Sequence, residues 1–314
     1  MNKINHSNIV IEEKKIKLDV PSKLYKHSIY YIEWSNKERS PGKPVRMIYC
    51  FHRLMGTGRD FDVLATRLVN DIPEAIVICP DVAGRGKSQR LENSDDYAYH
   101  TYVSDAIELI KATRRSNCTV DFIGTSMGGL IGIFALGSPS SSLTFDRLIL
   151  NDVGPYVPVE SITRISTSLL ASRDKVFETR SDAVDYFQTI YKGFGSDLTR
   201  DQWENLAYEC FIEDQAYGTF KFHYDPLILK NFEKMAEKDF DIWSVWDNTI
   251  KNIKKSILII RGKSSDVLPK DIYEKMLKSD ERVVGIEFET GHAPSLVRDN
   301  EVQAILTFLL NEKL

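Results

Sequence analysis

The spacing of hydrophobic and polar positions changes along this chain and predicts two kinds of structure. Residues 9–35 alternate and are rich in β-branched side chains, which predicts a hairpin or meander with strands at 8–11, 15–20 and 28–34. From residue 45 onward, short apolar runs alternate with segments whose apolar residues recur at helical spacing. Such alternation predicts an α/β fold, in which a parallel sheet carries helices on both faces.

The elements of this second region follow from the same pattern. We expect strands at 47–51, 75–79, 118–123, 147–150, 256–260 and 283–288. We expect helices at 60–69, 102–111, 127–136, about 269–278 and near 297–310.

The alternation stops for about a hundred residues, from Gly154 to Lys255. This stretch is too long for a loop and therefore predicts an insertion with its own structure. Its pattern is helical at 162–170, 181–187 and 203–212. We therefore expect a core formed by residues 1–154 and 246–314, and a helical insertion over residues 155–245. The insertion is rich in aromatic residues, of which a minority should line an apolar pocket for an uncharged or largely apolar acyl substrate.

Composition and charge exclude several classes of partner and compartment. The chain has 314 residues, 42% hydrophobic residues and a net charge of −4, which gives no reason to expect nucleic acid as a partner. No apolar run approaches the length of a membrane span. The amino terminus lacks the apolar stretch of a secretory signal, and the four cysteines show no disulfide framework. These features predict a cytoplasmic protein with reduced cysteines and no membrane insertion.

Ser126 is the strongest candidate for a catalytic residue. It lies in Gly124-Thr-Ser-Met-Gly128, between an expected buried strand and an expected buried helix. A Gly-x-Ser-x-Gly turn between strand and helix is the nucleophile elbow, which projects the serine hydroxyl clear of the backbone. The two glycines are expected because a Cβ at either position would collide with the sharply turning chain.

A serine hydroxyl needs a base and an acid that orients the base, and the elbow predicts the chain order serine, acid, histidine. His292 suits the base, because it follows the last expected strand at the carboxyl edge of the sheet, where ligands bind. Asp266 follows the strand at 256–260 and Asp152 follows the strand at 147–150, so both qualify as the acid. We favour Asp266, whose strand comes next after the insertion and nearest the histidine loop.

The negative oxygen that develops during attack needs preorganised backbone donors. The amide of Met127, directly after the serine, is the first expected donor. The second is expected from the loop after the strand at 47–51, and we nominate the amide of Leu54.

The chain resembles the α/β-hydrolase superfamily, in the branch that holds carboxylesterases and ring-cleavage C–C hydrolases. The resemblance runs from about Met47 to the carboxyl terminus and rests on His52, the segment 81–88, the Ser126 elbow, the segment 151–155, Arg261-Gly-x-x-x-Asp266 and Gly291-His292. It implies an eight-stranded, mostly parallel sheet with a helical cap inserted after strand 6. One departure is Arg53, where family members usually carry glycine after the oxyanion-loop histidine.

The segment Gly84-Arg-Gly-Lys-Ser88 partly matches a phosphate-binding loop. The leading glycine of that motif would fall at position 81, which is an aspartate, and no helix is expected to start directly after Ser88. We interpret the segment as a structural loop.

These features predict a serine hydrolase that cleaves a carboxylic ester through an acyl-enzyme on Ser126, without a metal or a cofactor. C–C bond, lactone or thioester hydrolysis by the same three residues is the first alternative, since fold and triad do not choose between these bonds. A ligand-binding protein with little turnover is the second alternative, and Arg53 is the one feature that favours it.

Overall fold

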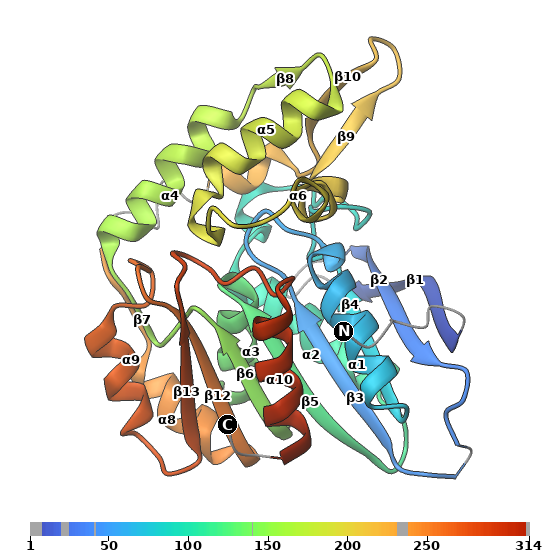
Figure 1. Ribbon diagram of the computed structural model, residues 1–314, viewed down its shortest axis with the longest axis vertical. Coiled ribbons are helices and arrows are strands. Elements are labelled where there is room, and N and C mark those ends of the chain that lie inside the picture. Colours follow the sequence, from blue (N-terminus) through green and yellow to red (C-terminus); the bar gives the residue numbers. More distant parts are fainter. Residues whose placement is uncertain (1–7, 20–24, 41, 140, 231–237, 312–314) are drawn as a thin grey trace.

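The computed structural model describes residues 8–19, 25–40, 42–139, 141–230 and 238–311. Its main sheet consists of β1 (Ile9–Asp19), β2 (Lys26–Asn36), β3 (Val45–Phe51), β4 (Ala75–Pro80), β5 (Cys118–Thr125), β6 (Phe145–Asn151), β12 (Ile253–Gly262) and β13 (Val283–Phe288). The strand order is β1-β2-β4-β3-β5-β6-β12-β13 (Figure 1). β2 pairs antiparallel with β1 and β4, and the strands from β4 to β13 are parallel. The predicted eight-stranded, mostly parallel sheet is confirmed.

The amino-terminal region forms two long strands instead of the three expected. β1 continues through the charged residues Glu12–Lys14, which pair with Glu33, Ile32 and Tyr31 of β2. Because β1 lies at the edge of the sheet, these charged side chains remain at the surface and do not interrupt the strand. Residues 1–7 and Val20, the expected end of the second strand, lie outside the described residues.

Helices cover both faces of the sheet. One face carries α1 (Asp62–Asp71) and α10 (Asp299–Asn311) (Figure 1). Their Leu64, Leu68, Ile305 and Phe308 pack with the sheet into one buried cluster. The other face carries α2 (Tyr99–Thr113), α3 (Met127–Gly137), α8 (Trp243–Lys251) and α9 (Lys270–Leu277). α3 is buried on nearly all sides, which explains why its sequence is apolar throughout.

The insertion forms a cap that lies above the core in Figure 1. It contains α4 (Val159–Ser172), α5 (Arg180–Ile190), α6 (Arg200–Ala207) and a three-stranded sheet of β8 (Val176–Phe177), β10 (Thr219–Phe222) and β9 (Phe211–Asp214). β7 (Tyr156–Val157) pairs with β11 (Phe240–Asp241) at its base. Short 3-10 helices span Gly58–Phe61, Ser94–Asp96, Lys192–Phe194, Tyr208–Cys210 and Pro226–Ile228.

The cap is not purely helical, and the helix expected over 203–212 is wrong in its second half. α6 ends at Ala207, and Phe211 begins β9, which pairs with β10 across a turn that contains Gly218. Phe211 and Phe222 are cross-strand partners whose ring centroids lie 4.6 Å apart. Apolar residues at 203, 206, 207 and 211 do suit a helix, but the aromatic pairing across the hairpin favours a strand from Phe211 onward.

The expected carboxyl-terminal boundary of the insertion falls within a helix. The expected boundary at residue 246 falls inside α8, and this helix packs against α3. At their contact, a Cβ added to Gly137 would lie 2.4 Å from the Val245 carbonyl oxygen. We therefore assign α8 to the core from Trp243.

The cysteines and the lengths of the helices bear on the expectations of reduced thiols and of no membrane insertion. All four cysteines are free, and three of them are buried. Among the described residues, no helix combines the length and the apolar character needed to cross a bilayer.

Candidate active site

Ser126 occupies a tight turn between β5 and α3. Its backbone has φ 52° and ψ −116°, a conformation that is rare for a residue with a side chain. The Ser126 amide donates a 3.0 Å hydrogen bond to the carbonyl of Asn151 at the end of β6. The neighbouring strand therefore holds the turn in its strained conformation.

The glycines on either side of the turn leave no space for a side chain. A Cβ at Gly124 would lie 2.4 Å from the backbone of Gly128 and Gly129. A Cβ at Gly128 would lie 2.0 Å from the carbonyl oxygen of Phe51 at the end of β3. The predicted steric requirement for both glycines is confirmed, and α3 reaches β3 only because Gly128 has no side chain.

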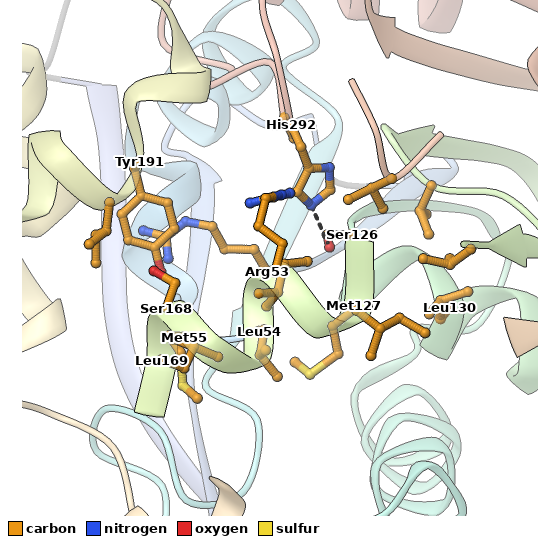
Figure 2. A pocket seen from close by; sticks show the side chains of 18 of the residues that line it. Arg53, Leu54, Met55, Ser126, Met127, Leu130, Ser168, Leu169, Tyr191 and His292 are labelled. Carbon is orange, nitrogen blue, oxygen red and sulfur yellow. Dashed lines mark hydrogen bonds between the residues drawn. The ribbon is translucent and has the colours of Figure 1, made fainter. Parts of the chain in front are cut away.

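Ser126, His292 and Asp152 form a continuous chain of hydrogen bonds. His292 Nε2 lies 2.9 Å from Ser126 Oγ (Figure 2). His292 Nδ1 lies 2.7 Å from Asp152 Oδ2. Because an ionised carboxylate only accepts hydrogen bonds, Nδ1 carries the proton toward Asp152 and Nε2 accepts the serine proton. Asp152 is fully buried, and its Oδ1 accepts a 2.8 Å hydrogen bond from the amide of Gly262.

The prediction that Asp266 orients His292 is wrong. Asp266 instead forms two hydrogen bonds with Arg164 of α4, at 2.6 Å and 2.8 Å, and its side chain is 46% exposed. Although burial raises the pKa of the Asp266 carboxyl, the hydrogen bonds from Arg164 bring it below its ordinary value. Asp152, the alternative that the sequence left open, is the residue that contacts His292.

The distance of Asp152 and of Asp266 from the end of the preceding strand is the feature that could have shown which of them contacts His292. Asp152 directly follows the last residue of β6 and has φ 58°, a left-handed conformation that aspartate tolerates. Asp266 lies four positions beyond the end of β12, after a turn. In the sheet β6 also lies between β5 and β12, so the loop after β6 lies beside the serine and close to the histidine loop.

The oxyanion loop is held in place by His52. His52 is fully buried; its Nδ1 donates to the Arg53 carbonyl at 2.6 Å and its Nε2 accepts from the Val82 amide at 2.9 Å. Burial lowers the pKa of His52 to about 3, although its hydrogen bond to Arg53 opposes this shift. The neutral ring therefore connects the loop after β3 with the loop after β4.

The two expected oxyanion donors border the same pocket as Ser126. Met127 is the first residue of α3, so its amide has no partner within the helix. Leu54 lies in the loop that His52 holds, and both residues line the pocket below Ser126 in Figure 2. Their role as donors stays a prediction.

Arg53 extends into the cap and is nearly fully buried. Its guanidinium carbon lies 4.3 Å from the ring centroid of Tyr191, and Nη2 lies 3.5 Å from Asp60 and 3.6 Å from the sulfur of Cys210. The ring face and the carboxylate both stabilise the buried cation. The departure from glycine at this position therefore places a core side chain among aromatic residues of the cap.

The pocket in front of Ser126 has a volume of about 140 Å³ and a mostly apolar wall. The core contributes Leu54, Met127 and Leu130, and the cap contributes Leu169 and Tyr191 (Figure 2). Pockets for drug-sized ligands have volumes of roughly 300–1,000 Å³, so this pocket suits a small substrate.

The segment that partly matches a phosphate loop has its polar groups engaged within the fold. Asp81 accepts hydrogen bonds from the amides of Gly58 at 2.7 Å and Lys87 at 2.8 Å. Ser88 Oγ donates to the Asp81 carbonyl at 2.6 Å. Burial raises the pKa of Asp81 to about 7, against the effect of the two amide bonds. The segment serves as a structural loop.

Within the described part of the chain, no group of three or more His, Cys, Asp or Glu side chains is arranged to hold a metal ion.

Comparison with known proteins assigns the family. A sequence model of the alpha/beta hydrolase family matches residues 49–304. The chain belongs to the alpha/beta hydrolase family. A 3-hydroxybutyrate-oligomer hydrolase of Cupriavidus necator is 36% identical over 282 residues, which cover 86% of this chain and 89% of that protein.

Solved structures agree with this assignment. A putative hydrolase from Rickettsia typhi is 28% identical with a TM-score of 0.80, over 96% of this chain and 100% of that one. An alpha/beta hydrolase from Novosphingobium aromaticivorans is 26% identical with a TM-score of 0.76, over 95% and 98% of the two chains. Together with the family match, these similarities identify the chain as a hydrolase.

The elbow geometry predicts that Gly128→Ala destabilises the protein. The added Cβ would meet the backbone of β3, which cannot move away as a side chain can, so a loss of about 1–3 kcal/mol or more is expected. Urea unfolding followed by circular dichroism measures it. Gly218→Ala in the cap hairpin is the comparison: nothing lies within 4 Å of the added atom, but φ is 68°, so this variant measures left-handed backbone strain of about 1–2 kcal/mol without a clash. A loss no larger than that of Gly218→Ala would contradict the steric argument.

The hydrogen bonds of His292 predict opposite outcomes for two aspartate variants. Asp152→Asn should lower kcat for p-nitrophenyl butyrate by about a thousandfold or more, because an amide cannot both hold the ring tautomer and stabilise the imidazolium. Asp266→Asn should keep kcat within a few-fold of the wild-type value. The reverse order of the two effects would return the role of the acid to Asp266.

Proposed function

We propose that this hydrolase cleaves carboxylic esters through an acyl-enzyme on Ser126. The observation that carries the proposal is the unbroken chain of hydrogen bonds from Asp152 through His292 to Ser126, at the mouth of an apolar pocket. A hydroxyl paired in this way with a neutral imidazole is an activated nucleophile.

In the first half of the proposed reaction, Ser126 Oγ gives its proton to His292 Nε2 and bonds to the acyl carbon. The carbonyl electrons move to the oxygen, where the amides of Met127 and Leu54 stabilise the negative charge. The amino terminus of α3, at Met127, adds its positive dipole at the same point. The bond to the alcohol then breaks as His292 returns the proton to the leaving oxygen.

In the second half, a water molecule gives a proton to His292 and attacks the acyl-enzyme. The second tetrahedral intermediate collapses, the carboxylic acid leaves and Ser126 regains its proton. Asp152 accepts a hydrogen bond from His292 Nδ1 throughout and stabilises the imidazolium that forms in each half.

Two observations favour a small ester of a hydroxy acid as the substrate. The Cupriavidus necator relative is named for oligomers of 3-hydroxybutyrate, in which successive units are joined by carboxylic esters. The pocket is small, and its apolar wall suits a short aliphatic acyl group. We therefore propose short oligoesters of this kind as the substrate class. Thioester, lactone and C–C substrates remain the alternatives for the same three residues.

The non-catalytic alternative loses the feature that favoured it. The guanidinium of Arg53 contacts Tyr191 of the cap and Asp60 of the core, and these contacts give the side chain a structural place between them. A residue in that position leaves the hydrogen bonds of Ser126 and His292 intact.

Hydrolysis of p-nitrophenyl esters from acetate to decanoate tests the proposal. We expect turnover that is highest for short acyl chains, because the pocket is small, and that falls at least about a thousandfold in Ser126→Ala. If the wild-type protein hydrolyses none of these esters but a fluorophosphonate still labels Ser126, the result would favour a thioester, lactone or C–C substrate. Absence of both turnover and labelling would favour a binding protein.

A further inference from the structure

The charged groups that line the pocket are all cationic. Of its 21 lining residues, Arg53 and Arg164 carry a permanent charge, and no aspartate or glutamate is among them. A small apolar pocket with guanidinium groups and no carboxylate provides a favourable environment for an anion. Each guanidinium is paired with a carboxylate outside the lining, so only one that keeps unused donors could bind a negatively charged group of the substrate.

Arg53 is not the group that would bind this charge. Its guanidinium is paired with Asp60 and packed between the rings of Phe187, Tyr191 and Phe194. Its Nη1 lacks a hydrogen bond but is itself buried. The second cavity that Arg53 borders has a volume of about 10 Å³, enough for one water molecule at most.

Arg164 has both the exposure and the free donors that an anion needs. Its side chain is 53% exposed. Arg164 lines the pocket together with Ile165 and Ser168 of the same helix, α4. Asp266 accepts from Nε and from one N–H of Nη2. A guanidinium has five N–H donors, so three remain, and within the described chain none of these has a partner.

We propose that Arg164 binds the carboxylate of an anionic ester and thereby selects substrates such as hydroxy-acid oligomers with a free carboxyl end. Asp266 fixes the plane of the guanidinium, and the unpaired edge receives the substrate carboxylate through charge-assisted hydrogen bonds. The expected apolar acyl pocket is retained, and the charge is recognised at its border. This inference rests on the proposed ester hydrolysis and adds the substrate's charge to it.

The ion pair itself gives a way to separate recognition from a structural role. Arg164→Gln and Asp266→Asn break the same contact between the cap and the core. If the contact only holds the cap in place, both variants should have the same effect. If Arg164 recognises an anion, Arg164→Gln should remove the preference for a charged substrate. Asp266→Asn should keep or increase that preference, because it removes a competing carboxylate.

The experiment compares the linear dimer of 3-hydroxybutyrate with the methyl ester of the same dimer. The two differ only in the charge of the terminal carboxyl group. We expect wild type to prefer the acid by about tenfold or more in kcat/KM, which corresponds to about 1.4 kcal/mol. In Arg164→Gln, the ratio of kcat/KM for the acid to kcat/KM for the methyl ester should fall toward one. In Asp266→Asn, this ratio should stay at least as high as in wild type.

Arg173→Gln is the matched control. Arg173 follows the same helix, its side chain is 47% exposed and it pairs with Asp174, but it does not line the pocket. In Arg173→Gln, the ratio of kcat/KM for the acid to kcat/KM for the methyl ester should equal the wild-type ratio. A wild-type ratio near one, or equal losses in Arg164→Gln and Asp266→Asn, would overturn the proposal.

A binding measurement separates this proposal from the proposed function. In Ser126→Ala, calorimetry should detect tighter binding of the acid than of the methyl ester, and the added Arg164→Gln change should abolish the difference. If neither dimer is hydrolysed but this difference persists, the anion site stands and the ester reaction fails. If the methyl ester is hydrolysed as well as the acid and binds as tightly, the reaction stands and the anion site fails.

Discussion

The buried carboxylate of Asp152 is the interaction on which the rest of the site depends. One oxygen accepts from the amide of Gly262 at the end of β12, and the other contacts His292. The Asp152 amide also donates to Ile260 of β12. A fully buried charge is tolerated only when it is paired and hydrogen-bonded, so these contacts both stabilise the carboxylate and fix the ends of two strands relative to the histidine loop.

The backbone around this carboxylate is arranged before any substrate arrives. The Ser126 turn is held by the Asn151 carbonyl, and the absence of a side chain at Gly128 lets α3 approach β3. His52 connects the loop after β3 with the loop after β4 and stays neutral. The donors that would stabilise an oxyanion thus lie on segments that cannot readily move, which is the condition for electrostatic stabilisation at low reorganisation cost.

Two arginines with different environments, Arg53 from the core and Arg164 from the cap, lie at the pocket. Arg53 connects the oxyanion loop to the aromatic core of the cap, where its charge is enclosed by rings and by Asp60. Arg164 comes from the cap itself, meets Asp266 of the core and keeps part of its hydrogen-bonding capacity. An apolar enclosure strengthens the interactions of any charge that enters it, so the position of these two groups matters more than the net charge of −4.

The sequence by itself determined the features that depend on neighbours along the chain. Strand and helix spacing predicted the parallel sheet, and the glycines around Ser126 predicted the elbow, because periodicity and steric space at a turn are local properties. Only the tertiary structure decided which aspartate contacts His292, why the cap contains the β9–β10 hairpin, and where Arg53 and Arg164 point. Asp152 and Asp266 both follow strands, and their difference arises from the strand order and from a partner on α4, about 100 residues away in the chain. Contacts between distant segments depend on how the layers pack, and a local pattern gives at most an indirect signal of them, such as the position of Asp152 directly after its strand.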